Sequence, residues 1–361
     1  MGREAFHFDW ITALILLVLA SFGLFLLLTI NQSLFLQQLF FVVLGIGFLY
    51  LFSRLDGLLL WWAGPWAYIV ANILLAVSYF GPSIRGATRW IMVGPIQLQP
   101  SELVKPLLIL AFARFISQYP PRDKRNILIH LGLFILPFFL VVRQPDIGSS
   151  IVYTSFWFAM MMAGGLSLAI VLLAGLVIGL IFPLVWHWLA GYQKARILTF
   201  LEPGLDPKGA GYNALQSMIA VGSGQWFGRG LGRGTQSHLR FLPEYHTDFI
   251  FATLVEDLGF LGGITLLGMY AILLWRILVT LLRERTESLF AFAFSIGLFA
   301  MILSQIFIHA GMNMGILPIT GITLPFISYG GSSILALSTS FGLWWAIRRG
   351  ESGSVANMSS D

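Results

Sequence analysis

Three ionisable side chains lie close together in this chain, at the point where a polar stretch runs into a long apolar one. They are Glu244, His246 and Asp248, within FLPEYHTDFIF at 241–251. Only 10% of the residues are charged. Because ionisable groups at a membrane boundary are costly to keep away from water, such a cluster indicates a function. The competing interpretation is a helix cap, in which Thr247 or Asp248 satisfies the free N–H groups of the helix that follows.

A second charged pair occurs in QPSELVKP, residues 99–106. Pro100 and Ser101 predict a helix start with Ser101 as the N-cap, and Glu102 and Lys105 follow on one face of that helix. One interpretation is an ion pair within the membrane, in which each charge lowers the burial cost of the other. The other interpretation is a polar wall of a substrate cavity.

Cations gather in the loops on one side of the predicted helices. Either they are solvated surface residues, or they bind an anionic partner such as phosphate or pyrophosphate, for which the arginine fork is well shaped. In GSGQWFGRGLGRG, 222–234, glycine alternates with arginine, which is compatible with an anion-binding nest. In RQPD, Arg143 and Asp146 flank a proline at the end of a span and are interpreted as an interfacial anchor. The full set of cations is Arg85, Arg89, Arg143, Lys194, Arg196, Lys208, Arg229, Arg233 and Arg240.

Toward the C-terminus, GMNMGILPITGITLPFISYGGSS at 311–333 interrupts an apolar region with glycine, proline and serine. Irregular backbone at membrane depth is tolerated only inside protein or along a wet cavity. His309, Asn313, Ser328 and Tyr329 are candidates to line such a cavity. His309 taken alone is more typical of a packing residue.

The composition places these residues in a membrane protein. The chain has 361 residues, 57% of them hydrophobic, and no cysteine; its mean hydropathy is +0.84. This is not the balance of a soluble globular protein. Without cysteine, disulfides, thiolate catalysis and cysteine-ligated metals are excluded, and a scattered net charge of +5 does not indicate nucleic acid. The first apolar run is long enough to span the membrane and to stay, so no cleavable signal peptide is expected.

Apolar runs of about 17–25 residues predict ten membrane-spanning helices in a single polytopic domain, 1–361. An even number puts both ends on one side, and the Lys and Arg residues of the short loops, such as Arg54 and the PPRDKRN run, mark that side as cytoplasmic. The spans are expected near 10–30, 36–53, 58–80, 102–118, 126–143, 149–164, 166–188, 249–275, 287–308 and 332–347.

Three loops on the opposite face, about 81–101, 189–248 and 309–331, are rich in polar residues, glycine and proline. The middle loop is the longest, and long loops are usually either functional or disordered. Its apolar residues and the amphipathic segment at 212–221 argue against disorder. We expect an ordered cap on the outer membrane surface.

Four segments, QPSELVKP, LDPKGAGYNALQS, FLPEYHTDFIFA and LPFISYGGSS, together resemble the SEDS family (shape, elongation, division and sporulation) of bacterial peptidoglycan glycosyltransferases. The likeness runs over almost the whole chain. GTQSHLRFLPE and the short N-terminus resemble the RodA-type branch, which serves rod-shape elongation, more than the division branch. The resemblance implies an all-α fold of about ten transmembrane helices, with cytoplasmic ends and a large extracytoplasmic loop between helices 7 and 8.

The resemblance also implies roles for residues. Asp248, in the HTD triplet, falls on the catalytic aspartate, Glu102 and Lys105 fall on the intramembrane pair, and Trp90 falls on an outer-loop tryptophan. The chain departs from the family pattern at His309, Thr323 and Asp257, none of which is Asp248. The further substrate-binding candidates are Arg85, Arg143, Arg196, Gln216, Glu244, His246 and Ser328.

The implied substrate is lipid II, a disaccharide-peptide on undecaprenyl pyrophosphate. A sugar hydroxyl of the acceptor attacks the anomeric carbon of the donor, and pyrophosphate leaves. Since pyrophosphate needs charge neutralisation rather than a proton, one carboxylate base, Asp248, and a set of outer cations suffice. Metal-ligand spacing is absent. A divalent cation that bridges Asp248, Glu244 and a substrate phosphate is the one cofactor that these residues would accommodate.

By resemblance, the expected partners are a class B penicillin-binding protein, which is a transpeptidase, and other membrane proteins of the elongation complex. Two alternatives stay open. In a lipid II flippase, Glu102 and Lys105 would belong to a polar path across the bilayer. In a non-catalytic scaffold of the wall-synthesis complex, Asp248 would be dispensable. The concentration of charge and glycine on the outer face favours surface chemistry over transport.

Overall fold

The chain folds into helices that coincide with the predicted spans. The computed structural model describes residues 9–82, 89–94, 96–188, 191–202, 211–239, 241–284 and 288–358. The helices are α1 Trp10–Ile30, α2 Gln32–Ser53, α3 Gly57–Val77, α4 Pro100–Leu103, α5 Lys105–Gln118, α6 Lys124–Arg143, α7 Ile147–Ala163, α8 Leu168–Trp188, α9 Gly191–Leu201, α10 Tyr212–Ser223, α11 Thr235–His238, α12 Ile250–Glu284, α13 Leu289–Asn313 and α14 Gly331–Met358.

Six of these helices, α1, α2, α3, α6, α12 and α13, are long and apolar enough to cross a membrane. Helix α7 and part of α8 are apolar but shorter. The side chains that face outward explain why a membrane is required: Trp66 of α3 is 69% exposed and Leu180 of α8 is 73% exposed. Apolar surface of this extent would be unfavourable in water. The molecule is therefore an all-helical, multi-span membrane protein.

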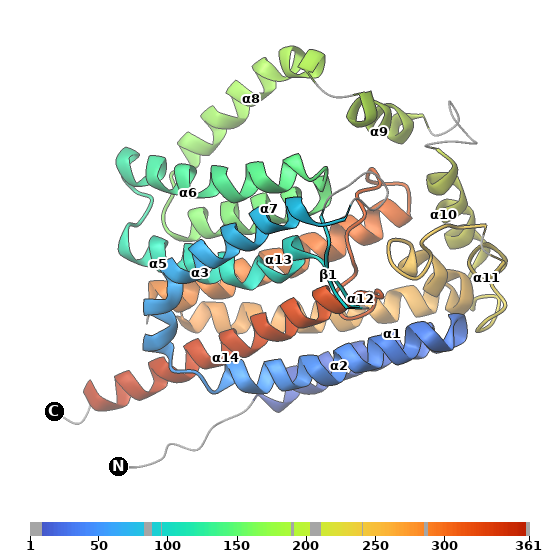
Figure 1. Cartoon of the computed structure of the whole chain (residues 1–361), viewed down its shortest axis with the longest axis horizontal. Helices are drawn as coiled ribbons and strands as arrows, with labels where there is room; N and C mark the ends of the chain where they lie inside the picture. Colours follow the sequence, from blue (N-terminus) through green and yellow to red (C-terminus); the bar gives the residue numbers. More distant parts are fainter. Residues whose placement is uncertain are drawn as a thin grey trace.

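The long helices lie side by side along one direction, and α10 and α11 lie at one end of the bundle (Figure 1). Helix α14 ends at the opposite end (Figure 1). The start of α1 is tied to the later part of α12, where Arg276 Nη2 lies 2.8 Å from Asp9 Oδ1. In the described residues, strands β1 Ile91–Val93 and β2 Ile96–Leu98 form an antiparallel hairpin in which Ile91 pairs with Leu98.

Helix α13 forms much of the core. Its neighbours include α5 and α7, where a Cβ on Gly297 would lie 2.7 Å from Met160 and 2.9 Å from Ile109. Such close approach is possible only because glycine has no side chain at this crossing. Trp344 of α14 is fully buried, and its indole N–H donates to Ser295 Oγ of α13 at 2.8 Å. Helices α13 and α14 are therefore linked directly, in addition to the segment 314–330 that joins them.

Helix α12 consists of two helical segments joined at Gly259, where φ is 73° and ψ is −170°. The glycine-rich loop, residues 222–234, supplies hydrogen-bond acceptors to the first turn of the second segment. The N–H of Phe260 donates to the Gln225 carbonyl at 2.7 Å, and that of Leu261 donates to the Trp226 carbonyl at 3.2 Å. N–H groups in the first turn of a helix lack partners within the helix, so this loop takes the place of a capping side chain.

The same loop binds Asp257 of α12. The buried Asp257 carboxylate accepts from the N–H groups of Gly232 and Gly234, both at 3.2 Å, and lies 3.0 Å from His238 Nε2. The anion-binding nest predicted from 222–234 thus forms, but it binds a carboxylate of the same chain. The interpretation of these N–H groups as a phosphate site is wrong.

The neighbouring Glu256 likewise accepts hydrogen bonds from the next few residues of the loop. Its buried carboxylate accepts from the N–H groups of Gln236 at 2.8 Å and Ser237 at 3.1 Å, and from the Ser237 hydroxyl at 2.7 Å. Two carboxylates on α12 therefore organise residues 232–238. The hydrogen bonds to charged acceptors compensate for the burial of both groups.

Two glycines of this loop provide a matched test of its contact with α12. Gly228 and Gly232 both have positive φ. A Cβ at Gly228 would lie 2.1 Å from the Asp257 carbonyl oxygen, whereas a Cβ at Gly232 would have no atom within 4 Å. Gly232→Ala should cost about 1–2 kcal/mol of backbone strain. Gly228→Ala should cost clearly more, because the loop must also separate from α12. Thermal unfolding of both purified variants checks this, and equal melting temperatures would contradict it.

His238 makes the stability of this segment depend on pH. Its pKa is raised above the ordinary value, because the hydrogen bond to the Asp257 carboxylate outweighs burial, and the charge of Glu256 adds to the effect. A raised folded-state pKa means that the stabilisation is complete below about pH 6.5 and is lost as the pH rises through the folded pKa. The melting temperature of wild type minus that of His238→Gln should therefore be largest in acid and shrink in alkali. His187→Gln is the matched control and should show no such trend, because His187 is exposed and its Nδ1 lies 2.9 Å from the Pro183 carbonyl rather than beside a carboxylate.

Candidate functional site

Asp248 lies in the turn directly before α12 and is half-buried. Its backbone carbonyl accepts from Asn313 Nδ2 at 3.0 Å. Its carboxylate faces Gly321, where a Cβ would lie 3.4 Å from Oδ2. Gly321 has φ of 74°, which favours glycine. Asp248 is thus held through its main chain, beside a backbone segment that leaves room for the carboxylate.

The turn that carries Asp248 is fixed from two sides. The Glu244 carbonyl accepts from the N–H groups of Thr247 at 3.1 Å and Phe249 at 3.2 Å, and Glu244 itself has φ of 52°. From the C-terminal segment, Ser328 Oγ donates to the Thr247 carbonyl at 2.8 Å. The Tyr329 N–H donates to the His246 carbonyl at 2.9 Å. FLPEYHTD and LPFISYGGSS, far apart in sequence, therefore form one unit.

Helix α2 stabilises that unit through one side chain, Gln38. Gln38 is 1% exposed; its Nε2 donates to the Ser328 carbonyl at 3.0 Å, and its Oε1 accepts from the Gly330 N–H at 3.1 Å. The amide therefore satisfies two backbone groups in a segment without regular structure. Such groups would otherwise be costly within a membrane bundle.

The helix-cap interpretation of Thr247 and Asp248 requires revision at Ala252. The N–H of Ala252, in the first turn of α12, donates to Asn313 Oδ1 at 3.0 Å. A side chain from α13 thus satisfies this N–H group, so Asp248 is not needed for it.

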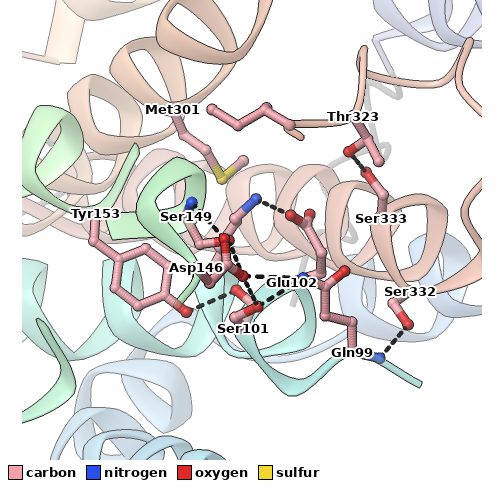
Figure 2. A network of polar contacts seen from close by, with 12 residues as sticks. Gln99, Ser101, Glu102, Asp146, Ser149, Tyr153, Met301, Thr323, Ser332 and Ser333 are labelled. Atoms are coloured by element: carbon pink, nitrogen blue, oxygen red, sulfur yellow. Dashed lines mark hydrogen bonds and ion pairs between the residues drawn. The ribbon is translucent and has the colours of Figure 1, made fainter. Parts of the chain in front are cut away.

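Glu102 and Lys105 form a buried ion pair, with Nζ 2.5 Å from Oε1 and side chains 6% and 1% exposed. Ser101, one residue earlier, is not the N-cap: α4 begins at Pro100, which lacks an N–H, after Gln99. Instead, Ser101 Oγ donates to Asp146 Oδ2 at 2.8 Å, and the Ser101 carbonyl accepts from Tyr153 at 2.7 Å (Figure 2).

Asp146 is the centre of this network rather than an interfacial anchor. It is 3% exposed and accepts from Gln99 Nε2 at 3.0 Å and from the N–H and hydroxyl of Ser149 at 3.0 and 2.9 Å (Figure 2). The bond to Ser149 also caps α7. The network joins the start of α4 to the start of α7, so the Glu102–Lys105 pair lies where two helices begin.

The segment 320–323 links the two parts of the site. Gly321 lies against Asp248, while a Cβ on Gly148 of α7 would lie 2.6 Å from Ile322 Cγ1. The Thr323 hydroxyl donates to Ser333 Oγ of α14 at 3.0 Å (Figure 2). Asp248 and the α4–α7 network are therefore joined by one short stretch of backbone.

The family of the chain follows from comparison with known proteins. The model of the FtsW/RodA/SpoVE family, described as cell cycle proteins, matches residues 5–353. The chain belongs to this family.

Its relatives have consistent names. The chain is 41% identical over 289 residues to the peptidoglycan glycosyltransferase MrdB of Escherichia coli strain K12, a match that covers 79% of this chain and 77% of that protein. It is 37% identical over 297 residues to the probable peptidoglycan glycosyltransferase FtsW of Aromatoleum aromaticum, covering 79% and 72%.

Solved structures give the same fold. The rod shape determining protein RodA of Thermus thermophilus is 26% identical, with a TM-score of 0.73 and coverage of 97% and 99%. A chain from work on the structural coordination of polymerization and crosslinking by a peptidoglycan synthase complex is 28% identical, with a TM-score of 0.84 and coverage of 95% and 98%. The fold is therefore RodA-like.

Of the residues proposed for this FtsW/RodA/SpoVE protein, the turn brings Glu244, His246, Asp248 and Ser328 together. Two other candidates, Arg143 and Gln216, lie on the helices α6 and α10. The exposed Arg143 guanidinium lies over its own helix, 5.5 Å from the centre of the Phe139 ring. Gln216 is half-buried on α10, next to Ser217, whose hydroxyl donates to the Asn313 carbonyl at 2.9 Å.

Three further candidates are placed less closely. Trp90 is half-buried just before β1, and the Arg89 guanidinium lies 6.0 Å from the centre of its ring. Arg196 falls on α9, and Arg85 lies outside the described residues.

The sequence alone did not indicate that Asn313 binds the Asp248 carbonyl, or that Gln38 binds the backbone at Ser328 and Gly330. A signal was present for Gln38, because an amide within an apolar helix requires a hydrogen-bonding partner. For metals, no group of three His, Asp or Glu side chains converges among the described residues.

Proposed function

We propose that this protein is a peptidoglycan glycosyltransferase that polymerises lipid II into glycan strands during cell elongation and cell-shape maintenance, and releases undecaprenyl pyrophosphate. The names of its relatives support the reaction class. One observation carries the proposed site: Asp248 is a half-buried carboxylate on a turn whose backbone is fixed by Asn313 and Ser328. A base held in this way is pre-oriented toward a bound hydroxyl.

In the proposed reaction, Asp248 takes the proton of the acceptor 4-hydroxyl. The oxygen of that hydroxyl forms a bond to the anomeric carbon of the donor, while the bond from that carbon to the pyrophosphate breaks. The pyrophosphate leaves with the electron pair and needs positive charge nearby. Outer-face cations, with Arg89 and Arg143 among them, are proposed to supply it, and a divalent cation at Asp248 and Glu244 would act in the same sense.

The proposed topology has ten spans within one polytopic domain of the bacterial inner membrane. Both termini are cytoplasmic, and Asp248 and the loop 189–248 face outward. Support comes from the opposite positions of α10 and of the C-terminal end of α14 in the bundle (Figure 1). The basic PPRDKRN loop fits the cytoplasmic side.

The proposed partners are lipid II as substrate, a class B penicillin-binding protein, and other membrane proteins of the elongation complex. The partnership is supported by the likeness to a chain studied within a peptidoglycan synthase complex that couples polymerization to crosslinking. A polymerase that acts beside a transpeptidase delivers each new strand directly for crosslinking.

The test is polymerisation of labelled lipid II by the purified protein with its transpeptidase partner. Glycan ladders are expected, together with release of undecaprenyl pyrophosphate. Their absence from an intact complex would contradict the proposal. Lipid II transfer across liposomes by the same preparation would then support the flippase, and neither activity would support the scaffold.

A further inference from the structure

Four residues stand at intervals of one turn along one face of α13: Met301, Gln305, His309 and Asn313. All four are buried, with exposed fractions of 1% or less. Met301 lies beside the Asp146 network (Figure 2), whereas Asn313 holds the Asp248 carbonyl. This face of the helix therefore runs from one part of the site to the other.

Both the oxygen and the nitrogen of the Asn313 amide form hydrogen bonds near Asp248. Its Oδ1 accepts from the Ala252 N–H at 3.0 Å, and its Nδ2 donates to the carbonyls of Asp248 at 3.0 Å and His309 at 2.8 Å. The amide thus fixes the residue that carries the carboxylate to both α12 and α13.

His309, one turn earlier, fixes the other side of the carboxylate. Its Nδ1 lies 2.6 Å from the Ile322 carbonyl. Since a carbonyl oxygen can only accept, Nδ1 carries the proton. Ile322 follows Gly321, the residue against which the Asp248 carboxylate rests. His309 therefore holds the segment that limits where the carboxylate can lie.

We propose that Asn313 and His309 are positioning residues that act together on Asp248, Asn313 through its backbone and His309 through the segment at Gly321. The inference rests on the proposed role of Asp248 as the base. A base displaced by about 1 Å loses on the order of 100-fold in rate, so the two residues affect turnover without touching substrate.

Gln305 supplies the matched control. It lies one turn from His309 on the same face and is fully buried, but in the described part of the chain neither of its amide atoms has a hydrogen-bond partner. It therefore holds neither Asp248 nor the segment at Gly321. Gln305→Leu changes the same buried stripe without removing a hydrogen bond.

The kinetic test compares His309→Leu, His309→Asn, Asn313→Ala and Gln305→Leu in the lipid II assay. His309→Leu and Asn313→Ala should lower kcat about 10- to 100-fold with little change in KM. His309→Asn places an N–H donor where Nδ1 stood and should recover most of kcat, and Gln305→Leu should stay near wild type. A loss in Gln305→Leu equal to that in His309→Leu, or no recovery in His309→Asn, would overturn the inference.

A second readout needs no activity. The chain has no cysteine, so a single pair can be introduced at Asp248 and Gly321. A Cβ on Gly321 would lie 4.0 Å from Asp248 Cγ, so the thiols of Asp248→Cys and Gly321→Cys would reach disulfide geometry after a small rotation of the two side chains. The pair should crosslink under mild oxidation, lose most of that crosslinking with His309→Leu, and regain it with His309→Asn.

Equal crosslinking in all three backgrounds would overturn the role of His309. The crosslink does not depend on a working base, so the two ideas fail separately. If Asp248→Asn were active while crosslinking still required His309, the proposed catalytic role would fall and the positioning would stand.

Discussion

Asp248→Asn should lower the rate of lipid II polymerisation by about 10²- to 10⁴-fold, the usual contribution of a general base. Asparagine preserves the shape of the side chain and the backbone bond from Asn313, but it cannot accept the proton of the attacking hydroxyl. The fold and binding to the transpeptidase should therefore persist. Glycan formation over time, measured with equal amounts of intact complex, gives the rate.

The control is Asp56→Asn, the same chemical change at the N-cap of α3, where the carboxylate accepts from the N–H groups of Leu58 and Leu59. It should cost no more than about 1 kcal/mol of stability and leave polymerisation unchanged. Similar rates for Asp248→Asn and wild type would remove Asp248 from the mechanism and direct attention to Glu102.

Breaking the Glu102–Lys105 pair should destabilise the protein more than any other single change considered for this chain. Glu102→Gln or Lys105→Met alone leaves one charge buried without its partner, which costs about 3–5 kcal/mol. The double variant removes both charges and should regain most of that stability. Thermal unfolding of the detergent-purified proteins compares the three variants with wild type.

The double variant also separates the two interpretations of the pair. If it is stable and polymerises lipid II at the normal rate, the pair serves only the fold. If it is stable but inactive, the charges belong to the substrate cavity. A double variant that is less stable than either single one would contradict the burial argument itself.

The positions of the helices could be predicted because hydrophobic runs have a length set by the bilayer. Each predicted span overlaps a helix. The fourth, predicted at 102–118, is formed by α4 and α5 and begins two residues earlier, at Pro100. The Glu102–Lys105 ion pair was also predicted from the sequence, and Asp248 was singled out in it, because charges are conspicuous in a chain with so few of them. These features depend on local composition, which a single sequence contains.

The contacts that hold the site could not be predicted, since they join residues distant in sequence. Asn313 binds Asp248 and Gln38 binds Ser328 across many intervening residues. The same limitation explains the errors at Ser101 and at the glycine-rich loop. Ser101, expected to cap its own helix, instead donates to Asp146. The N–H groups of the loop, expected to bind an external anion, instead donate to Asp257.

The break in α12 has a consequence for the size of the substrate. The segment after Gly259 runs to Glu284; at about 1.5 Å per residue it is about 37 Å long, enough to cross the hydrocarbon by itself. If the second segment alone crosses the hydrocarbon, the segment 250–258 places Asp248 no more than about 13 Å from it. Under the proposed function, a sugar joined to its lipid by a spacer longer than pyrophosphate would then lie beyond the carboxylate, and one with a shorter spacer would not reach it.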